Sequence, residues 1–145
     1  MLVYLDVCAI QRPLDDPAQL RVRLEADAVV SLIGLCESGD LELVASAAHE
    51  IENSQNPYPA RRAHAADVLG ISRHYVPTSA AVARRAAQYE HDGIRRLDAL
   101  HLASAVVSGA VFFCTTDDLL LRRGREAETD STSVVSPLDL VQRLP

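Results

Sequence analysis

Four acidic residues stand where apolar segments of the sequence end or where helices are predicted to begin: Asp6, Glu52, Asp98 and Asp117. Each alone would serve as an ordinary helix cap. Four carboxylates from four separate segments instead indicate a shared site. Carboxylates a few ångströms apart repel one another, and a divalent cation relieves that repulsion. Because hard oxygen ligands suit Mg²⁺ or Mn²⁺, which also bind phosphate, the pattern predicts metal-dependent hydrolysis of phosphodiester bonds.

Helical phase decides between two neighbouring glutamates, Glu50 and Glu52. Residues two apart lie about 200° apart around a helix and cannot share a face. Ala48, Ile51 and Gln55 mark the predicted inward stripe, and Glu52 lies on it. We therefore assign Glu52 to the site and Glu50 to the solvent-exposed surface.

Arginine pairs lie close to two of the acids in the sequence. Arg95 and Arg96 precede the third acid, and Arg122 and Arg123 follow the fourth. Such pairs are usually solvated helix faces, but here they are candidates for contacts with the phosphates of a nucleic-acid backbone. The four acids account for four of the six net negative charges, so the net charge of −6 does not exclude a polyanionic substrate.

Alternating strands and helices must position these residues. Short apolar segments predict strands at residues 2–6, 41–44, 74–76, 111–114 and 134–135. Amphipathic spacing and capping residues predict helices from Asp16 to Gly39, from Ser46 to about Asn53, from Pro59 to about Leu69, from a Thr78 cap to near Gly93, from Asp98 to Gly109, and after residues 115–118. Helices supply the crossovers that parallel strands need, so we predict a three-layer α/β/α fold with a parallel sheet of about four to five strands. The acids would then meet at the carboxyl edge of the sheet.

Length and composition favour a single soluble domain over residues 1–145. A chain of 145 residues that is 48% hydrophobic can bury one core without disulfides or metals. The cysteines, Cys8, Cys36 and Cys114, are widely spaced in apolar surroundings and are expected to be core residues. No apolar run is long enough to span a membrane, and the N-terminus lacks the pattern of a signal peptide. We therefore expect a cytoplasmic location and no membrane association.

Over nearly its whole length the sequence resembles the PIN-domain family of metal-dependent ribonucleases, which includes the VapC-type toxins of bacterial toxin–antitoxin pairs. The family's hydrophobic strand that ends in Asp is similar to VYLD, which ends at Asp6. The family's motif of a Ser followed, after five residues, by a Glu is similar to SAAHEIE, which ends at Glu52. Its D-A-L-H-L-A helix start is similar to DALHLA at Asp98, and its T-x-D pattern to TTD at Asp117. Four weak motifs in this order make a specific resemblance.

The resemblance implies a catalytic, metal-binding quartet of the four acids, with Thr115 or Thr116 orienting a ligand or a water molecule. It also implies an RNA substrate, a homodimer, and an antitoxin partner that inserts a segment into the acidic site. Asp118 is expected to be a helix cap rather than an outer-shell acid. In one departure, Val7 and Cys8 stand where many relatives have a hydroxyl residue and Asn, so polar bracing from these two positions is expected to be missing.

Other chemistries fit the sequence less well. His101, three residues after Asp98, is a possible general base, but its apolar neighbours favour a buried histidine that hydrogen-bonds across the core. The remaining histidines lack zinc-ligand spacing. A phosphoacceptor receiver domain needs a lysine, and the chain has none. A haloacid-dehalogenase-like phosphatase needs D-x-D after the first strand, where this chain has D-V-C. The G-K-[S/T] motif of a P-loop enzyme is absent. The alternative that remains is a non-catalytic or solitary PIN-like module that binds RNA or protein.

Overall fold

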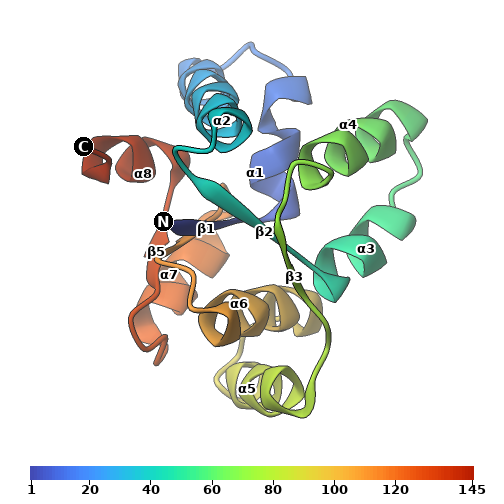
Figure 1. Ribbon diagram of the computed structural model, residues 1–145, viewed down its shortest axis with the longest axis vertical. Coiled ribbons are helices and arrows are strands. Elements are labelled where there is room, and N and C mark those ends of the chain that lie inside the picture. Colours follow the sequence, from blue (N-terminus) through green and yellow to red (C-terminus); the bar gives the residue numbers. More distant parts are fainter.

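A parallel sheet of five strands forms the centre of the computed structural model, which describes residues 1–145 (Figure 1). The strands are β1 (Leu2–Leu5), β2 (Glu42–Ser46), β3 (His74–Val76), β4 (Phe112–Cys114) and β5 (Ser133–Val135). Their order in the sheet is β3-β2-β1-β4-β5, and Val3 of the central strand lies opposite Leu43 on one side and Phe112 on the other. The predicted α/β fold with a parallel sheet of four to five strands is confirmed.

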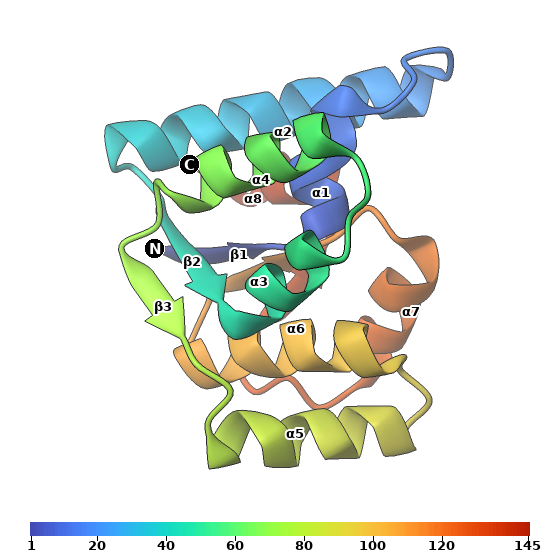
Figure 2. The same cartoon turned by 90° about the vertical axis from the view of Figure 1, so that its right-hand side faces the viewer.

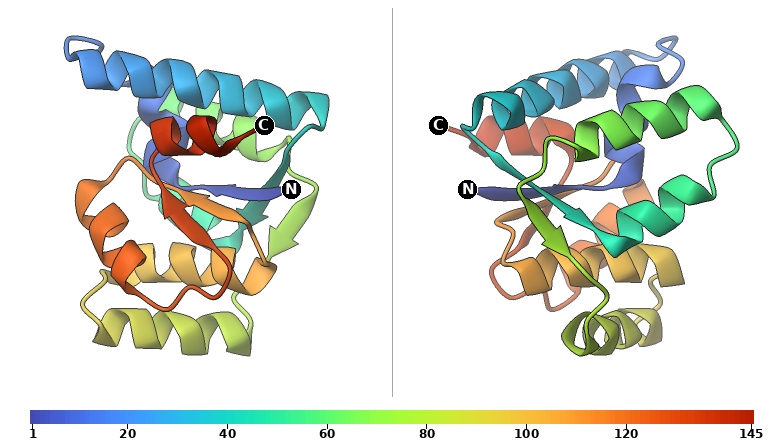
Figure 3. Two further views of the ribbon diagram at one scale, coloured as in Figure 1. Left: turned by 90° about the vertical axis from the view of Figure 1, so that its left-hand side faces the viewer. Right: turned by 45° about the vertical axis from the view of Figure 1, so that its right-hand side comes forward.

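Helices cover both faces of the sheet. They are α1 (Val7–Gln11), the 3-10 helix η1 (Arg12–Leu14), α2 (Leu20–Ser38), α3 (Ala47–Ser54), α4 (Pro59–Leu69), α5 (Ala80–His91), α6 (Arg96–Ser108), α7 (Asp118–Glu126) and α8 (Pro137–Arg143). Helices α1, α2, α4 and α8 lie on one face, and α6 and α7 lie on the other, with α5 packed outside α6 (Figures 2 and 3). No helix is long and apolar enough to cross a membrane.

Side chains of the central strand alternate between the two cores. Val3 and Leu5 are buried beneath the helices of the first face, together with Leu32 of α2. Tyr4 points to the opposite face and is buried against Phe113 and residues of α6 such as Leu102. This alternation follows from the two-residue period of a strand, and burial on both faces explains the continuous apolar run of the first strand.

The order in which strands are added to the sheet reverses at β1, because β2 and β3 lie on one side of it and β4 and β5 on the other. In open parallel sheets such a point leaves a crevice outside the carboxyl ends of the strands, where ligands bind. Asp6 directly follows β1, and Thr115 and Asp117 follow β4. The ends of these strands and the starts of α1, α6 and α7 gather on the right-hand side of Figure 2.

Two predicted helix starts were wrong, and two short helices, α1 and α8, were not predicted. The long helix α2 begins at Leu20 rather than Asp16, whose carboxylate accepts a hydrogen bond from the amide of Ala18 and closes a turn. The cap of α5 is Ser79, whose hydroxyl accepts from a first-turn amide, and not Thr78. Helix α1 was not expected at all, since its five residues VCAIQ are too few to show a helical period.

Candidate active site

Asp6 is a buried carboxylate held by three donors. It caps the N-terminus of α1, where its Oδ1 atom accepts a hydrogen bond of 2.8 Å from the amide of Val7. Its Oδ2 atom accepts from the hydroxyl of Thr115 at 3.0 Å and from the thiol of Cys8 at 3.2 Å. Only 3% of the residue is exposed, so these bonds compensate for much of the cost of burying a carboxylate.

Cys8 braces the site, contrary to expectation. It is half-buried rather than a core residue, and its Sγ atom lies 3.3 Å from the Oγ1 atom of Thr115 as well as against Asp6. Burial, and then the charge of Asp6, raise the pKa of the thiol well above its usual value, so Cys8 stays protonated and can donate. The thiol of Cys8 thus supplies a hydrogen-bond donor to the carboxylate of Asp6. The other two cysteines are buried and unpaired, as expected.

Glu52 lies beside Asp6, and Glu50 does not. The hydroxyl of Ser46 caps α3, and from this start the helix places Glu52 towards α6, where its Oε1 atom accepts a hydrogen bond of 3.1 Å from Nε2 of His101. Glu50 is exposed and accepts from the hydroxyl of Tyr75. The stripe used to predict this phase was partly wrong, since Ile51 and Gln55 are exposed; the inward line of this short helix runs from Ala48 and His49 to Glu52.

His101 completes a cluster with these two acids. Its Nε2 atom is 3.9 Å from Oδ1 of Asp6, and single ligand atoms of Asp6, Glu52 and His101 all lie within 4.8 Å of one another. Its burial was predicted correctly, but its contact with the site was not. Burial acts to lower the pKa of His101, yet the hydrogen bond with Glu52 and the charges of the surrounding carboxylates outweigh it and raise that pKa.

A chain of buried hydrogen bonds runs from His101 into the core. The hydroxyl of Tyr4 lies 2.6 Å from Nδ1 of His101 and 2.6 Å from Oγ of Ser46. Beyond Ser46, the ring of His49 accepts from the Ser46 amide through Nδ1 and donates to the carbonyl of Leu5 through Nε2. Burial lowers the pKa of His49 to about 3, so this ring is neutral. The chain fixes the orientation of His101 and hence of the Nε2 atom that faces Glu52.

Replacing Tyr4 by phenylalanine is expected to lower the free energy of unfolding by about 1–3 kcal/mol, because Nδ1 of the buried His101 loses its partner and the buried hydroxyl of Ser46 loses one of its partners. Urea denaturation of the wild type and the variant measures this difference in the free energy of unfolding. Tyr89→Phe is the matched control, since the Tyr89 hydroxyl makes a single bond, to the carbonyl of Glu128, and its loss should cost less. Equal losses in the two variants would show that the chain through Tyr4 adds no stability beyond one ordinary hydrogen bond.

Asp98 and Asp117 form the other half of the site, joined by an arginine. Asp98 lies in the first turn of α6, and Asp117 caps α7 by accepting from the amides of Leu119 and Leu120. Arg95 lies between them, 3.4 Å from Oδ2 of Asp98 and 3.1 Å from Oδ2 of Asp117. Burial, and then the negative charge of Asp6, raise the pKa of Asp98 to about 6, even though Arg95 opposes the shift.

Two other residues that were predicted to belong to the site, Asp118 and Thr116, contact Arg21 of α2. Asp118 was expected to be a cap, but Asp117 has that role, and Asp118 forms an ion pair with Arg21 at 2.7 Å. The backbone carbonyl of Thr116 accepts from the same arginine. Arg21 had not been singled out, because nothing local relates it to a turn 95 residues away.

The arginines near the acids have different surroundings from one another. Arg95 contacts carboxylates of the site itself, and the guanidinium of Arg123 donates to the carbonyl of Gly93. Arg96 and Arg122 are exposed and form no ion pair within the chain. Among these four arginines, Arg96 and Arg122 therefore have no contact within the chain to give up before they meet a polyanion.

Comparisons with known proteins agree with this architecture. A chain of VapBC2 from Rickettsia felis, solved bound to a DNA fragment from the promoter, has a TM-score of 0.59 and 14% sequence identity, and the match covers 94% of this chain and 98% of that one. No curated protein matches the sequence. The family model described as PIN domain matches residues 3–126, which include all four acids. The chain belongs to the PIN domain family.

Proposed function

We propose that this protein is a metal-dependent endoribonuclease of the VapC type, which acts in the cytoplasm as the toxin of a toxin–antitoxin pair. Its family supports nuclease chemistry. The observation that carries the proposal is the crowding of acids at the crevice between β1 and β4. Ligand atoms of Asp6, Glu52 and His101 lie within 4.8 Å, and Asp98 is close enough to Asp6 for its pKa to be raised.

The donor set fits Mg²⁺ or Mn²⁺. Carboxylate oxygens predominate, as these ions prefer. Burial first, and then the negative charge of Asp6, raise the pKa of Asp98, and Arg95 opposes this shift only in part. Asp6, Glu52, Asp98 and Asp117 would hold the cation. When bound, it would supply the positive charge that polarises a phosphodiester and activates water for attack.

Residues around the acids keep the carboxylates in place. Thr115 and Cys8 donate to the Oδ2 atom of Asp6, and His101 donates to Glu52, so both carboxylates have fixed orientations before a ligand arrives. The side chain of Arg95 is 67% exposed, and this long side chain can rotate from the acids to a phosphate of the substrate.

Partners follow from the same proposal. Exposed Arg96 and Arg122 are proposed to contact the RNA backbone, whereas Arg123 is engaged with the carbonyl of Gly93. The likeness to VapBC2, which was solved with promoter DNA, supports an antitoxin partner for this chain. We propose a homodimer as the assembly, as the family resemblance implies.

Paired glutamate variants test the site. Glu52→Gln should lower the rate of RNA cleavage by about 100-fold or more, because a neutral amide is a poor ligand for a hard cation even though it can still accept from His101. Glu50→Gln should keep the rate within about twofold, because Glu50 is exposed and a glutamine there can still accept from Tyr75. The measurement is the initial rate on a labelled oligoribonucleotide with Mn²⁺. Full activity of Glu52→Gln would remove this residue from the site, and no metal-dependent cleavage by the wild type would favour a non-catalytic module.

A further inference from the structure

A groove of about 710 Å³ opens next to Glu52. Its walls come from the end of α3, from the turn that joins α3 to α4, and from Val7, the residue that follows Asp6. Figure 2 shows this turn beside the edge where the strands end. Because Glu52 belongs both to the groove and to the acidic cluster, a molecule in the groove extends directly into the candidate active site.

Tyr58 lines this groove and is 64% exposed. The chain has only six aromatic residues apart from histidine, and four of them are buried: Tyr4, Tyr89, Phe112 and Phe113. The other exposed aromatic residue, Tyr75, lies on β3 with its hydroxyl bonded to Glu50, away from the groove. Tyr58 is therefore the one aromatic ring whose surface is available beside the acids.

The backbone around Tyr58 is held firmly. Proline residues stand on both sides of it, and its amide donates to the side-chain oxygen of Asn56 at 3.0 Å. The guanidinium of Arg62 in turn donates to the carbonyl of Asn56 at 2.6 Å. A ring on a fixed backbone loses little conformational entropy when a ligand packs against it.

Arg61 provides positive charge in the same groove. One of its nitrogens, Nη2, is bonded to Asp15 and to the carbonyl of Leu14, while its Nε and Nη1 atoms have no partner in the chain. The side chain is 30% exposed, so these donors can reach a bound anion. An aromatic face and a guanidinium together are the groups that bind a base and the phosphate next to it.

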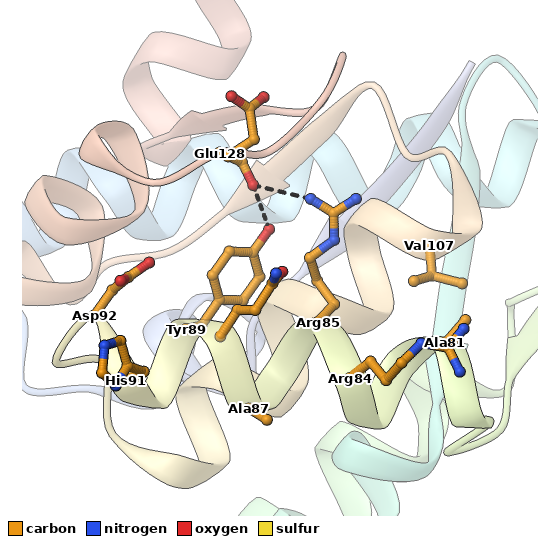
Figure 4. Close-up of a pocket in the computed structure, with 10 residues that line it drawn as sticks. Ala81, Arg84, Arg85, Ala87, Tyr89, His91, Asp92, Val107 and Glu128 are labelled. Atoms are coloured by element: carbon orange, nitrogen blue, oxygen red, sulfur yellow. Dashed lines mark hydrogen bonds between the residues drawn. The ribbon is translucent and has the colours of Figure 1, made fainter.

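A larger hollow elsewhere lacks these properties. It measures about 960 Å³ and runs along α5 beside Val107 and Glu128, with no site acid in its wall (Figure 4). Its aromatic residue, Tyr89, is 2% exposed, and both Tyr89 and Arg85 donate to the carbonyl of Glu128. Tyr89 and Arg85 therefore serve the fold.

We propose that the Tyr58 groove binds an unpaired nucleotide of the RNA substrate, with the base stacked on Tyr58 and a phosphate contacted by Arg61. This inference rests on the proposed nuclease function and narrows its substrate to single-stranded RNA or an exposed loop. In a duplex each base already stacks on its neighbours and cannot lie flat on a protein ring. The phosphodiester next to the stacked nucleotide then lies beside Glu52, at the acidic cluster.

Binding of a fluorescently labelled single-stranded oligoribonucleotide, measured by anisotropy in chelator so that no cleavage occurs, tests the groove. Tyr58→Ala should weaken binding about tenfold or more, whereas Tyr58→Phe, which keeps the ring, should stay within about twofold of wild type. Tyr75→Ala removes the other exposed ring and should change nothing. Arg61→Gln should reduce the slope of log affinity against log salt by about 0.7, the value for one phosphate of a single strand.

The outcomes separate this inference from the proposed function. If the wild type cleaves RNA but Tyr58→Ala binds and cleaves normally, the groove is not a nucleotide subsite and the nuclease proposal stands. If the same RNA binds equally well when annealed into a duplex, the stacking mode is wrong. If the wild type neither binds nor cleaves RNA, both proposals are wrong. A Tyr58→Ala variant that loses binding only to a protein partner would assign the groove to a protein segment and overturn the RNA subsite.

Discussion

Replacing Asp6 by asparagine is expected to lower the rate of metal-dependent RNA cleavage by about 1,000-fold or more while the protein stays folded. Outer partners of metal ligands already cost about 10–100-fold when they are removed, and Asp6 is proposed as a direct ligand. Asparagine caps a helix about as well as aspartate, so the hydrogen bond from the amide of Val7 can persist. The measurements are the cleavage rate on a labelled oligoribonucleotide with Mg²⁺ or Mn²⁺ and the thermal melting curve.

Asp16→Asn is the matched control for that experiment. Asp16 also accepts a hydrogen bond from a backbone amide, at 3.0 Å, but it lies in an exposed turn away from the acids. This variant should keep wild-type activity and stability. Excess chelator should abolish cleavage by the wild type. Cleavage that survives chelation would refute the metal mechanism, and full activity of Asp6→Asn would remove Asp6 from the site.

Replacing Asp98 by asparagine is expected to raise the free energy of unfolding of the metal-free protein by about 1–3 kcal/mol near neutral pH. Burial and the charge of Asp6 raise the pKa of Asp98 to about 6, and each pKa unit corresponds to about 1.4 kcal/mol. The neutral amide escapes this cost. It also gives up the pairing with Arg95, but that arginine is 67% exposed, so the loss is small.

Metal ions should reverse the order of stability of the wild type and Asp98→Asn. About 10 mM Mg²⁺ or Mn²⁺ should raise the melting temperature of the wild type much more than that of Asp98→Asn, because only the wild type keeps the full set of ligands. Thermal melts with chelator and with metal decide the matter. Equal metal-induced shifts in the two proteins would return Asp98 to the role of an ordinary first-turn acid.

The pH dependence of the metal-free protein follows from the same pKa. Because the pKa of Asp98 is higher in the folded state than in the unfolded state, its protonation favours folding. The penalty is therefore complete above about pH 6 and is relieved as the pH falls from about 6 towards about 4. The stability advantage of Asp98→Asn over the wild type should shrink across this window, as urea unfolding at several pH values would measure. An advantage that stays constant would show that the charge of Asp98 is not its cause.

Most of the fold and the approximate place of each acid could be predicted because they depend on local patterns. Short apolar runs that alternate with amphipathic segments predict parallel strands with helical crossovers. Because the strands are parallel, the ends of β1 and β4, and with them Asp6 and Asp117, lie at one edge of the sheet. The cap at Ser46 set the start of α3, and the helical period separated Glu52 from Glu50, although Ile51 and Gln55 of the predicted inward stripe are exposed.

The surroundings of the acids were decided only by tertiary structure. The bond between His101 and Glu52 and the pairing of Arg95 with Asp117 join residues 49 and 22 positions apart, and no local period relates them. Cys8 reads as an apolar core residue in the sequence, yet packing of β1 against β4 places its thiol on Thr115. A side chain's propensity reflects its neighbours in the chain, whereas its hydrogen-bond partner depends on which distant segment the two cores bring next to it, and that is why the sequence indicated where the acids lie but not what holds them.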